Sequence, residues 1–367
     1  MTDAPQRVVP LTSDTETKPT AAMREAIANA EVGDEQKGED PTVNALQARV
    51  AKMLGKEAAL WFHSGSICNF VATKVHTQPA DAVIADFMSH IIRAESGGIA
   101  MTSGVQVEPI ETERGIFTSE QLDAAVRRLS TVPVPYSQPS RLTWIEQTHN
   151  FGGGSVWSLD ELTSVAKTSH DRGMVVHMDG ARLLNACVAS GVDPAEFAAR
   201  TDSLWLDFTK GLGAPIGAVM AGSSEFIAKA RRMKHVFGGA MRQAGIAAAG
   251  CLHALDHHVD RLAEDHENAR RLAKGIQGID GIDLATPVPE TNMVFFDVSR
   301  SGLPGPAFLE RLAVLGIKMG YVRGRIRAVT HLDVTSGDIE RSIDAIGRVA
   351  AAEITSPGRD GSSTSAY

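Results

Sequence analysis

The chain has 367 residues, of which 43% are hydrophobic and 22% are charged, and its formal net charge is −8. This length can bury a large core and usually forms two domains, while the acidic balance without a basic run argues against nucleic acid as the main partner. Three widely separated cysteines indicate neither a disulfide framework nor a zinc site, and no apolar segment reaches bilayer length, so we expect a cytoplasmic protein without a membrane partner.

The first quarter of the chain predicts two helices and then a candidate phosphate-binding turn. Residues 1–10 are expected to be flexible, and helices are expected over 21–30 and from 42 or 44 to 54. A short strand over 58–62 is followed by Ser64-Gly65-Ser66 at the start of an apolar helix. The first turn of a helix presents free amide hydrogens and a partial positive charge, which suits a phosphate group, although most Ser-Gly-Ser turns only cap helices.

A repeated strand–helix alternation follows. Strands are predicted over 83–85, 105–110, 143–145, 175–178, 204–206 and 216–221, with helical patterns such as 159–172 between them. This order predicts an α/β fold with a mostly parallel sheet that is covered by helices on both faces.

A change of composition inside one long predicted helix marks the expected domain boundary. The helix extends to about residue 276, and its first half is rich in Ala and Gly whereas its second half is strongly charged. We therefore expect a large domain over 11–255, a smaller C-terminal α+β domain over 256–355 and a disordered tail over 356–367.

Two of the predicted strands end near an acid and a lysine. Asp179 closes the strand that begins at Val175, and Lys210 follows the strand over 204–206 on a glycine-containing turn, one helix-containing crossover later. In open α/β folds ligands bind at such strand ends. A lysine that holds an aldehyde and a carboxylate that keeps a pyridine nitrogen protonated are what a pyridoxal phosphate site needs. The simpler interpretation of the two residues by themselves is a buried ion pair.

Ten motifs in register then resemble the L-threonine aldolases over about residues 11–352. They are, in chain order, SDTETKPT, VGD…GEDPT, GKEAALWFHSG, THN, HMDGARLLNA, TKGLGAPIG, GGAMRQAG, EDHENAR, TNMVFF and RAVTHLDV. The resemblance implies the pyridoxal-phosphate (PLP) fold-type-I class, with a large domain built on a seven-stranded-type sheet and a smaller C-terminal domain. It also implies cleavage of a β-hydroxy-α-amino acid to glycine and an aldehyde, and a homotetramer, built as a dimer of dimers, whose active sites are shared between subunits.

The resemblance assigns cofactor-binding roles to several residues. It implies that Lys210 is the Schiff-base lysine, that Asp179 pairs with the pyridinium nitrogen, and that Arg182 lies near the cofactor oxygen and the substrate carboxylate. Ser64, Gly65 and Ser66 resemble the phosphate turn, although relatives more often have Thr at the last position. Arg242 resembles a phosphate-side arginine that reaches a neighbouring subunit's site.

The substrate-side roles are also implied by the resemblance. His90 is similar to the histidine stacked on the cofactor ring, and His149 to the histidine near the substrate hydroxyl. Ser13 and Arg327 resemble the groups that hold the substrate carboxylate. The base that removes the hydroxyl proton needs a pKa near the working pH. His90, His149 and Glu95 are all candidates, and the sequence does not choose among them.

Two departures from the family pattern suggest a substrate preference. Lys37 and Arg93 stand where relatives usually carry aromatic residues, in loops expected to face the substrate side chain. We expect two added cations to favour a negatively charged β-substituent, such as that of 3-hydroxyaspartate, over the methyl group of threonine. The alternative is that Lys37 only pairs with Glu39 or Asp40 at the surface.

Other functions stay open on the same scaffold. A PLP enzyme of this kind could instead catalyse β-elimination, as a hydroxy amino acid dehydratase does, or decarboxylation or racemisation. A non-catalytic binding protein is disfavoured because binding alone does not require a Schiff-base lysine. No metal site is predicted, since three nearby threonine hydroxyls are poor ligands by themselves.

Overall fold

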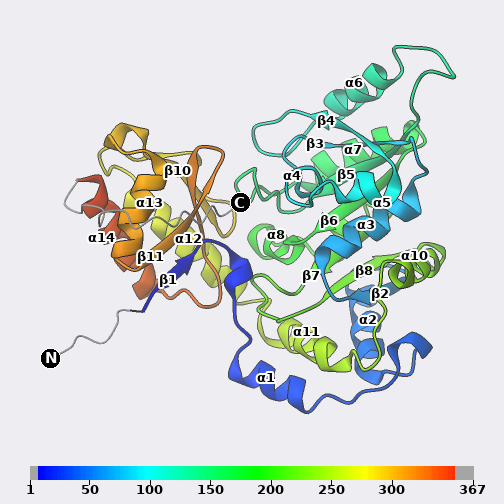
Figure 1. Cartoon of the computed structure of the whole chain (residues 1–367), viewed down its shortest axis with the longest axis horizontal. Coiled ribbons are helices and arrows are strands. Elements are labelled where there is room, and N and C mark those ends of the chain that lie inside the picture. Colours follow the sequence, from blue (N-terminus) through cyan, green and yellow to red (C-terminus); the bar gives the residue numbers. More distant parts are fainter. Residues whose placement is uncertain (1–6, 352–367) are drawn as a thin grey trace. The chain divides into compact units, whose positions relative to one another are not determined.

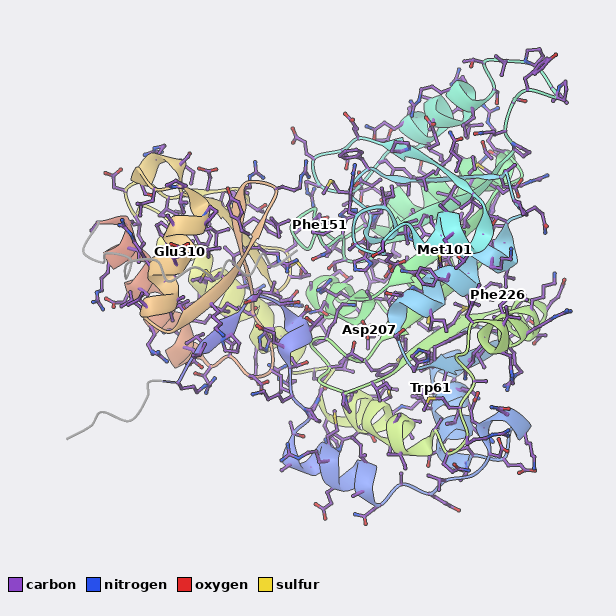
Figure 2. All side chains as sticks on the ribbon, in the orientation of Figure 1. Trp61, Met101, Phe151, Asp207, Phe226 and Glu310 are labelled. Carbon is purple, nitrogen blue, oxygen red and sulfur yellow. The ribbon has the colours of Figure 1, made fainter. Side chains whose placement is uncertain are left out.

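The computed structural model describes residues 7–351, and these form two compact units. The larger unit is the continuous segment Pro19–Val259. The smaller unit combines residues 7–18 with residues 260–351. Most elements of both units are labelled in Figure 1, and Figure 2 draws their side chains in the same orientation. Within the described range, no helix combines the length and the apolar composition that crossing a bilayer requires.

The larger unit is built on a seven-stranded sheet with the strand order β2-β8-β7-β6-β5-β3-β4. In that order the strands are β2 (Ala58–Phe62), β8 (Ala218–Gly222), β7 (Ser203–Asp207), β6 (Val175–Gly180), β5 (Ser140–Glu146), β3 (Ala82–Asp86) and β4 (Gln106–Ile110). Only β8 runs antiparallel to its neighbours, β2 and β7, and the other four pairings are parallel. The predicted mostly parallel sheet is confirmed.

Helices cover both faces of this sheet. Trp144 of β5 packs in an apolar cluster with residues of α3 and α10, whereas its neighbour Thr143 meets Ser169 of α7, with 2.8 Å between the two hydroxyl oxygens. Because successive strand residues point to opposite faces, α3 and α7 lie on opposite sides. The helices of this unit are α1 (Ala21–Ala28), α2 (Pro41–Met53), α3 (Gly65–His76), α4 (His90–Arg93), α5 (Gly98–Ser103), α6 (Ser119–Leu129), α7 (Leu159–Asp171), α8 (Leu183–Ser190), α9 (Pro194–Ala198), α10 (Ser224–Val236) and α11 (Gly245–His257), with the 3-10 turn η2 (Glu35–Lys37).

The smaller unit has a five-stranded sheet with the order β1-β11-β12-β10-β9. Its strands are β1 (Val9–Leu11), β11 (Ile317–Val322), β12 (Arg325–Val329), β10 (Met293–Asp297) and β9 (Asp283–Leu284), and its helices are α12 (Leu262–Ile276), α13 (Gly305–Val314) and α14 (Ser336–Ala350), with the 3-10 turns η1 (Asp14–Glu16) and η3 (Ser299–Ser301). An apolar core fills the space between this sheet and its helices. The predicted separate α+β unit is therefore present.

The N-terminal segment belongs to this smaller unit. Strand β1 pairs in parallel with β11, with Val9 opposite Ile317 and Leu11 opposite Met319. The expectation that residues 11–18 form part of the large domain therefore differs from the structure, because the strand that leads into them pairs with the C-terminal sheet and residues 7–18 belong to the smaller unit. Part of the segment expected to be flexible is a buried strand, while residues 1–6 and the expected disordered tail lie outside the described residues.

The expected single helix reaching residue 276 is wrong. It is two helices, α11 and α12, with a break over residues 258–261, where the chain passes from the larger unit to the smaller one. His258, which starts the break, is buried and forms a 2.7 Å contact from Nδ1 to the carbonyl oxygen of Leu212. A long-range contact of this kind leaves no local signal in the sequence, so the helical periodicity hid the break.

Candidate active site

Four neighbouring parallel strands of the larger unit carry an acid at or next to their carboxyl ends. These acids are Asp86 on β3, Glu146 on β5, Asp179 on β6 and Asp207 on β7, and each is at most 7% exposed. Asp179 lies directly opposite Glu146 in the register of β5 and β6. Buried carboxylates at the carboxyl edge of such a sheet mark the place where ligands bind in open α/β folds.

Asp179 is held at the floor of this edge by two amide donors. Its Oδ1 accepts from the main-chain N–H of Ala181 at 3.0 Å, and its Oδ2 accepts from the side-chain amide of Asn69 at 3.1 Å. Burial, together with the negative charge of Glu146, raises the pKa of Asp179 to about 7, although the charges of His90 and Lys210 oppose the shift. A bound cationic group at this carboxylate would therefore relieve an unfavourable buried charge.

His90 is oriented by two acids. Its main-chain N–H donates to Glu146 Oε2 at 2.8 Å, and its ring Nδ1 lies 2.9 Å from Glu95 Oε1. Burial lowers the pKa of His90, but the hydrogen bond with Glu95 and the charges of Glu146 and Asp179 outweigh burial and raise it overall. The side chain remains 35% exposed. His90 therefore combines an accessible ring with a carboxylate that fixes its orientation, as in a carboxylate–histidine pair of a hydrolase.

His149 is placed differently, with its side chain only 1% exposed. The N–H of Gly152 donates to its Nδ1 at 3.0 Å, and its Nε2 lies 3.2 Å from Asp86 Oδ1. Because Nδ1 accepts a hydrogen bond, the ring proton belongs on Nε2, facing Asp86. Burial lowers the pKa of His149, and the charges of Glu146 and Asp86 raise it to a net value above the ordinary one. The His149 ring, which follows β5, thus contacts the acid at the end of β3.

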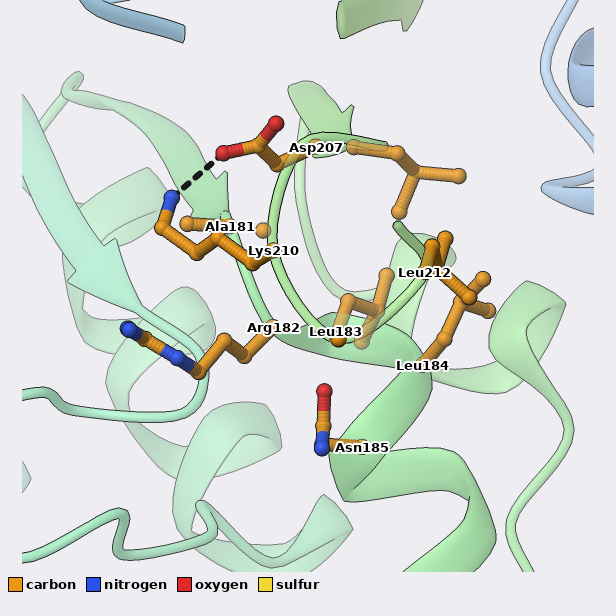
Figure 3. Close-up of a pocket in the computed structure, with 11 residues that line it drawn as sticks. Ala181, Arg182, Leu183, Leu184, Asn185, Asp207, Lys210 and Leu212 are labelled. Carbon is orange, nitrogen blue, oxygen red and sulfur yellow. Dashed lines mark hydrogen bonds and ion pairs between the residues drawn. The ribbon is translucent and has the colours of Figure 1, made fainter. Parts of the chain in front are cut away.

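Lys210 and Arg182 line one pocket of the larger unit together with Asp207. Figure 3 shows both cationic side chains extending to the same side of the loop, and its dashed line joins Lys210 to Asp207. The other oxygen of Asp207 accepts from the N–H of Thr209 at 2.8 Å and from its hydroxyl at 2.7 Å. The ion pair with Asp207, the last residue of β7, therefore holds the Lys210 amine near the carboxyl end of that strand.

The Ser64-Gly65-Ser66 turn begins α3 at the same edge. Ser64 is the N-cap residue, yet its side chain forms no capping hydrogen bond. A Cβ atom on Gly65 would lie 2.4 Å from the ring of Trp205, whose position in β7 is directly opposite Asp179 in β6. The absence of a side chain at Gly65 therefore lets the first turn of α3, with its free amide hydrogens, lie close against the sheet.

Comparison with known proteins finds similar chains over nearly the whole length of this one. The family described as Beta-eliminating lyase matches residues 10–300. The low-specificity L-threonine aldolase 1 of Arabidopsis thaliana is 38% identical over 92% of this chain and 95% of its own length. The low specificity L-threonine aldolase of Escherichia coli K12 is 35% identical over 89% of this chain and 95% of its own length. The threonine aldolase structure from Leishmania major superposes with a TM-score of 0.80 at 20% identity, covering 92% of this chain and 98% of that one.

The chain belongs to the beta-eliminating lyase family. Within that family the full-length matches place it in the threonine aldolase group, so the predicted resemblance is confirmed. The predicted PLP fold-type-I class is confirmed as well, because the fold is shared with the Leishmania major structure over nearly the whole length of both chains.

Some predicted site residues of this family member lie outside the Lys210 pocket. Arg93 is exposed, and its guanidinium carbon lies 3.7 Å above the ring of Phe87, while its Nε donates to the Phe87 carbonyl. Lys37 is exposed at the end of η2. Arg242 pairs with Asp34 at 2.9 Å. The structure thus gives Arg93 a local partner and leaves the substrate role of Lys37 as a prediction.

Ser13 and Arg327 lie together in the smaller unit. Arg327 of β12 donates from Nη2 to the carbonyl oxygen of Thr12 at 3.0 Å, next to Ser13. The Ser13 hydroxyl oxygen accepts from the hydroxyl of Thr15 at 2.9 Å and from its N–H at 3.2 Å. The two residues are therefore neighbours, and their predicted role in holding the substrate carboxylate stays a prediction.

Several residues of this lyase's site were not singled out from the sequence. They are Asn69, Asp86, Glu146 and Asp207. Asp86 and Asp207 end predicted strands as Asp179 does, so the strand-end rule that identified Asp179 could have found them. Asn69 sits inside an apolar helix and carries no comparable signal.

The close contact at Gly65 predicts a stability effect. In Gly65→Ala the new Cβ meets a ring that cannot move freely, because the Trp205 indole N–H donates to Asn69 at 2.7 Å. We expect a loss of about 1–3 kcal/mol in the free energy of unfolding, as for other overpacked sites. Gly337→Ala, near the start of α14, is the matched control, since its Cβ would have only an ordinary 3.8 Å contact. Equal urea midpoints for the two variants would contradict this.

Proposed function

We propose that this protein is a PLP-dependent aldolase that cleaves a β-hydroxy-α-amino acid of the L-threonine or L-allo-threonine type to glycine and an aldehyde. The observation that carries the proposal is the joint placement of Asp179 and Lys210 at one sheet edge, where the charge of Lys210 opposes the burial-raised pKa of Asp179. The family membership and the names of the relatives, low-specificity L-threonine aldolases, support the same conclusion.

The residues at this edge fit the cofactor by their chemistry. The amine of Lys210 would hold its aldehyde, the Asp179 carboxylate would hold its ring nitrogen, and the first turn of α3 would hold its phosphate. When bound, pyridoxal phosphate supplies an electron sink for the bond that breaks at Cα. The chain itself supplies orientation: Arg182 adds a second cation to the pocket, and a guanidinium can grip both oxygens of a carboxylate.

Among the three candidate bases, the geometry supports His90. Its Nδ1 is engaged by Glu95, which leaves Nε2 on a partly exposed ring to take the proton of the substrate hydroxyl. Both nitrogens of the buried His149 face groups of the chain, and Glu95 has a fully buried side chain. We therefore propose that His90 moves the proton and that His149 positions the strand ends.

Product analysis with added pyridoxal phosphate tests the proposal. An aldolase releases glycine and acetaldehyde from L-threonine, whereas the alternative, a β-eliminating dehydratase suggested by the family description, releases ammonia and a keto acid. A panel of L- and D-β-hydroxy amino acids would also define the preference at Cβ. Release of ammonia without glycine would replace the aldolase proposal by the elimination reaction.

The exposed cation Lys37 gives a prediction about substrate choice. The carboxylate of Asp40 accepts from the N–H groups of Gly33, Val43 and Gly245, so the structure gives it other partners than Lys37. We expect Lys37→Tyr to lower the ratio of kcat/KM for 3-hydroxyaspartate to that for threonine by up to about fivefold, since an exposed ion pair contributes about 1 kcal/mol or less. The control is Lys52→Tyr on α2. A wild type that prefers threonine, with a ratio unchanged by the substitution, would refute the idea.

We also propose a homotetramer with shared active sites, working in the cytoplasm. Arg242, predicted to serve a neighbouring subunit, has a 60% exposed side chain and is absent from the lining of its own chain's Lys210 pocket. Exposed apolar side chains occur on both sides of it in the sequence: Val236, Met241 and Ile246. Three buried free cysteines support a reducing compartment.

A further inference from the structure

Asn69 of α3 connects the two parts of the site, and every polar atom of its side chain is used. The amide nitrogen donates to Glu95 Oε1 at 2.7 Å and to Asp179 Oδ2 at 3.1 Å. The amide oxygen accepts from the indole N–H of Trp205 at 2.7 Å. The residue is 1% exposed, so water does not compete for these bonds.

The orientation of this amide follows from its partners. An indole N–H is only a donor, so the atom that faces Trp205 must be the amide oxygen. The nitrogen then faces Asp179 and Glu95, and its two hydrogens match two carboxylates. The indole is itself fixed, because Trp205 lies in β7 directly opposite Asp179 and packs against Gly65.

This amide is the group that lies between two buried acids. Side-chain amide donors stabilise the ionised form of a carboxylate, and two carboxylates that share one site otherwise repel each other. Glu95 Oε1 also receives the His90 contact at 2.9 Å, so a single oxygen joins Asn69 to His90. The other oxygen, Glu95 Oε2, is buried and has no hydrogen-bond partner among the described residues. The position of Glu95 therefore depends on Asn69 and His90.

We propose that Asn69 is a positioning residue that favours the ionised form of the Asp179 carboxylate at the cofactor nitrogen and, through Glu95, holds the His90 ring in place. The proposal rests on the proposed function, because it assumes that a pyridine nitrogen is bound at Asp179. The titratable groups that interact with Asp179 include Glu146 on β5, His90 on α4, Glu95 ahead of α5, His149 after β5, Lys210 after β7 and Cys68 on α3.

The test measures the affinity for pyridoxal phosphate from pH 5.5 to 8.5 rather than turnover. Affinity should fall on the acid side as Asp179 takes up a proton. In Asn69→Leu the carboxylate loses a donor, so we expect this fall to move to higher pH by about one unit, as for the loss of a hydrogen bond to a charged group. At neutral pH the Kd should rise about fivefold.

Two further variants separate positioning from packing. Trp205→Phe keeps an aromatic ring but removes the N–H that orients the amide, together with part of the indole, so it should shift the profile in the same direction by a smaller amount. Thr73→Val removes the 2.8 Å bond from the Thr73 hydroxyl to the main-chain oxygen of Asn69, leaving the side-chain amide untouched. It should lower thermal stability without shifting the profile.

The possible outcomes are distinct. If Asn69→Leu and Thr73→Val lower thermal stability alike and neither shifts the acid-side midpoint of the pyridoxal phosphate affinity profile, Asn69 contributes packing alone. The inference is then overturned. A wild type that binds pyridoxal phosphate but releases no glycine from threonine would overturn the proposed reaction, while the affinity profiles would still decide the role of Asn69. A wild type that does not bind the cofactor would overturn both.

Discussion

Replacing Lys210 is expected to abolish turnover while leaving a folded protein. Lys210→Ala and Lys210→Arg both remove the primary amine that would hold the cofactor aldehyde, so kcat should fall at least about a thousandfold in either variant, as expected for a covalent catalytic group. Borohydride treatment should fix the cofactor covalently to the wild-type chain at Lys210 and to neither variant, which mass spectrometry can show.

The two substitutions should differ in stability, because Lys210 pairs with Asp207, whose side chain is 4% exposed. Alanine leaves that carboxylate without its cation, and we expect a loss of about 3 kcal/mol in the free energy of unfolding. Arginine keeps a positive charge and should lose much less. Lys167→Ala, at an exposed pair with Asp171, is the control and should change neither property. Turnover by Lys210→Arg near the wild-type level would contradict the assigned role.

The sheet of the larger unit could be predicted from the sequence because its strands are buried apolar runs. Predicted strands such as 58–62 coincide with observed ones, and Asp179, predicted at a strand end, is the next-to-last residue of β6 at the carboxyl edge. Short or half-buried elements gave weaker signals. Strand β1 has three residues, and β11 was not predicted because its alternation is interrupted by Gly320.

The sequence also predicts some features of the candidate site and misses others. Lys210, Asp179 and Arg182 could be found because each follows a strand, and family motifs added His90 and His149. Pairings between distant residues could not be predicted, since nothing local in the sequence connects Asn69 to Asp179 or to Trp205. His266 is a further example, because it lies in the strongly charged helix α12 and is nevertheless buried, and burial lowers its pKa to about 4.

Asp179→Asn is expected to abolish turnover. It is also expected to remove a loss of folding stability that the cofactor-free wild type shows as the pH rises. The amide is neutral and would not hold a proton on the ring nitrogen, so the electron sink fails and kcat should fall by a factor on the order of 10³. One of the two donors at this position, the N–H of Ala181 or the amide of Asn69, would also meet an amide NH₂ group, which costs about 1–3 kcal/mol at all pH values.

The pH dependence separates these two effects. The pKa of Asp179 is about 7 in the folded protein and near 3.8 when unfolded, so between these values the folded state binds more protons. Stability of the wild-type apoprotein therefore falls as pH rises from about 4 to 7, by an amount on the order of a few kcal/mol, and this component is constant above pH 7. In Asp179→Asn the component disappears, whatever the constant cost of the lost hydrogen bond. Urea unfolding of both apoproteins at pH 5 and pH 8 checks this. If the free energy of unfolding falls equally in the two proteins between pH 5 and pH 8, the pKa of Asp179 is not raised by folding. Burial of Asp179 would then not be the reason why a cationic ring binds at this site.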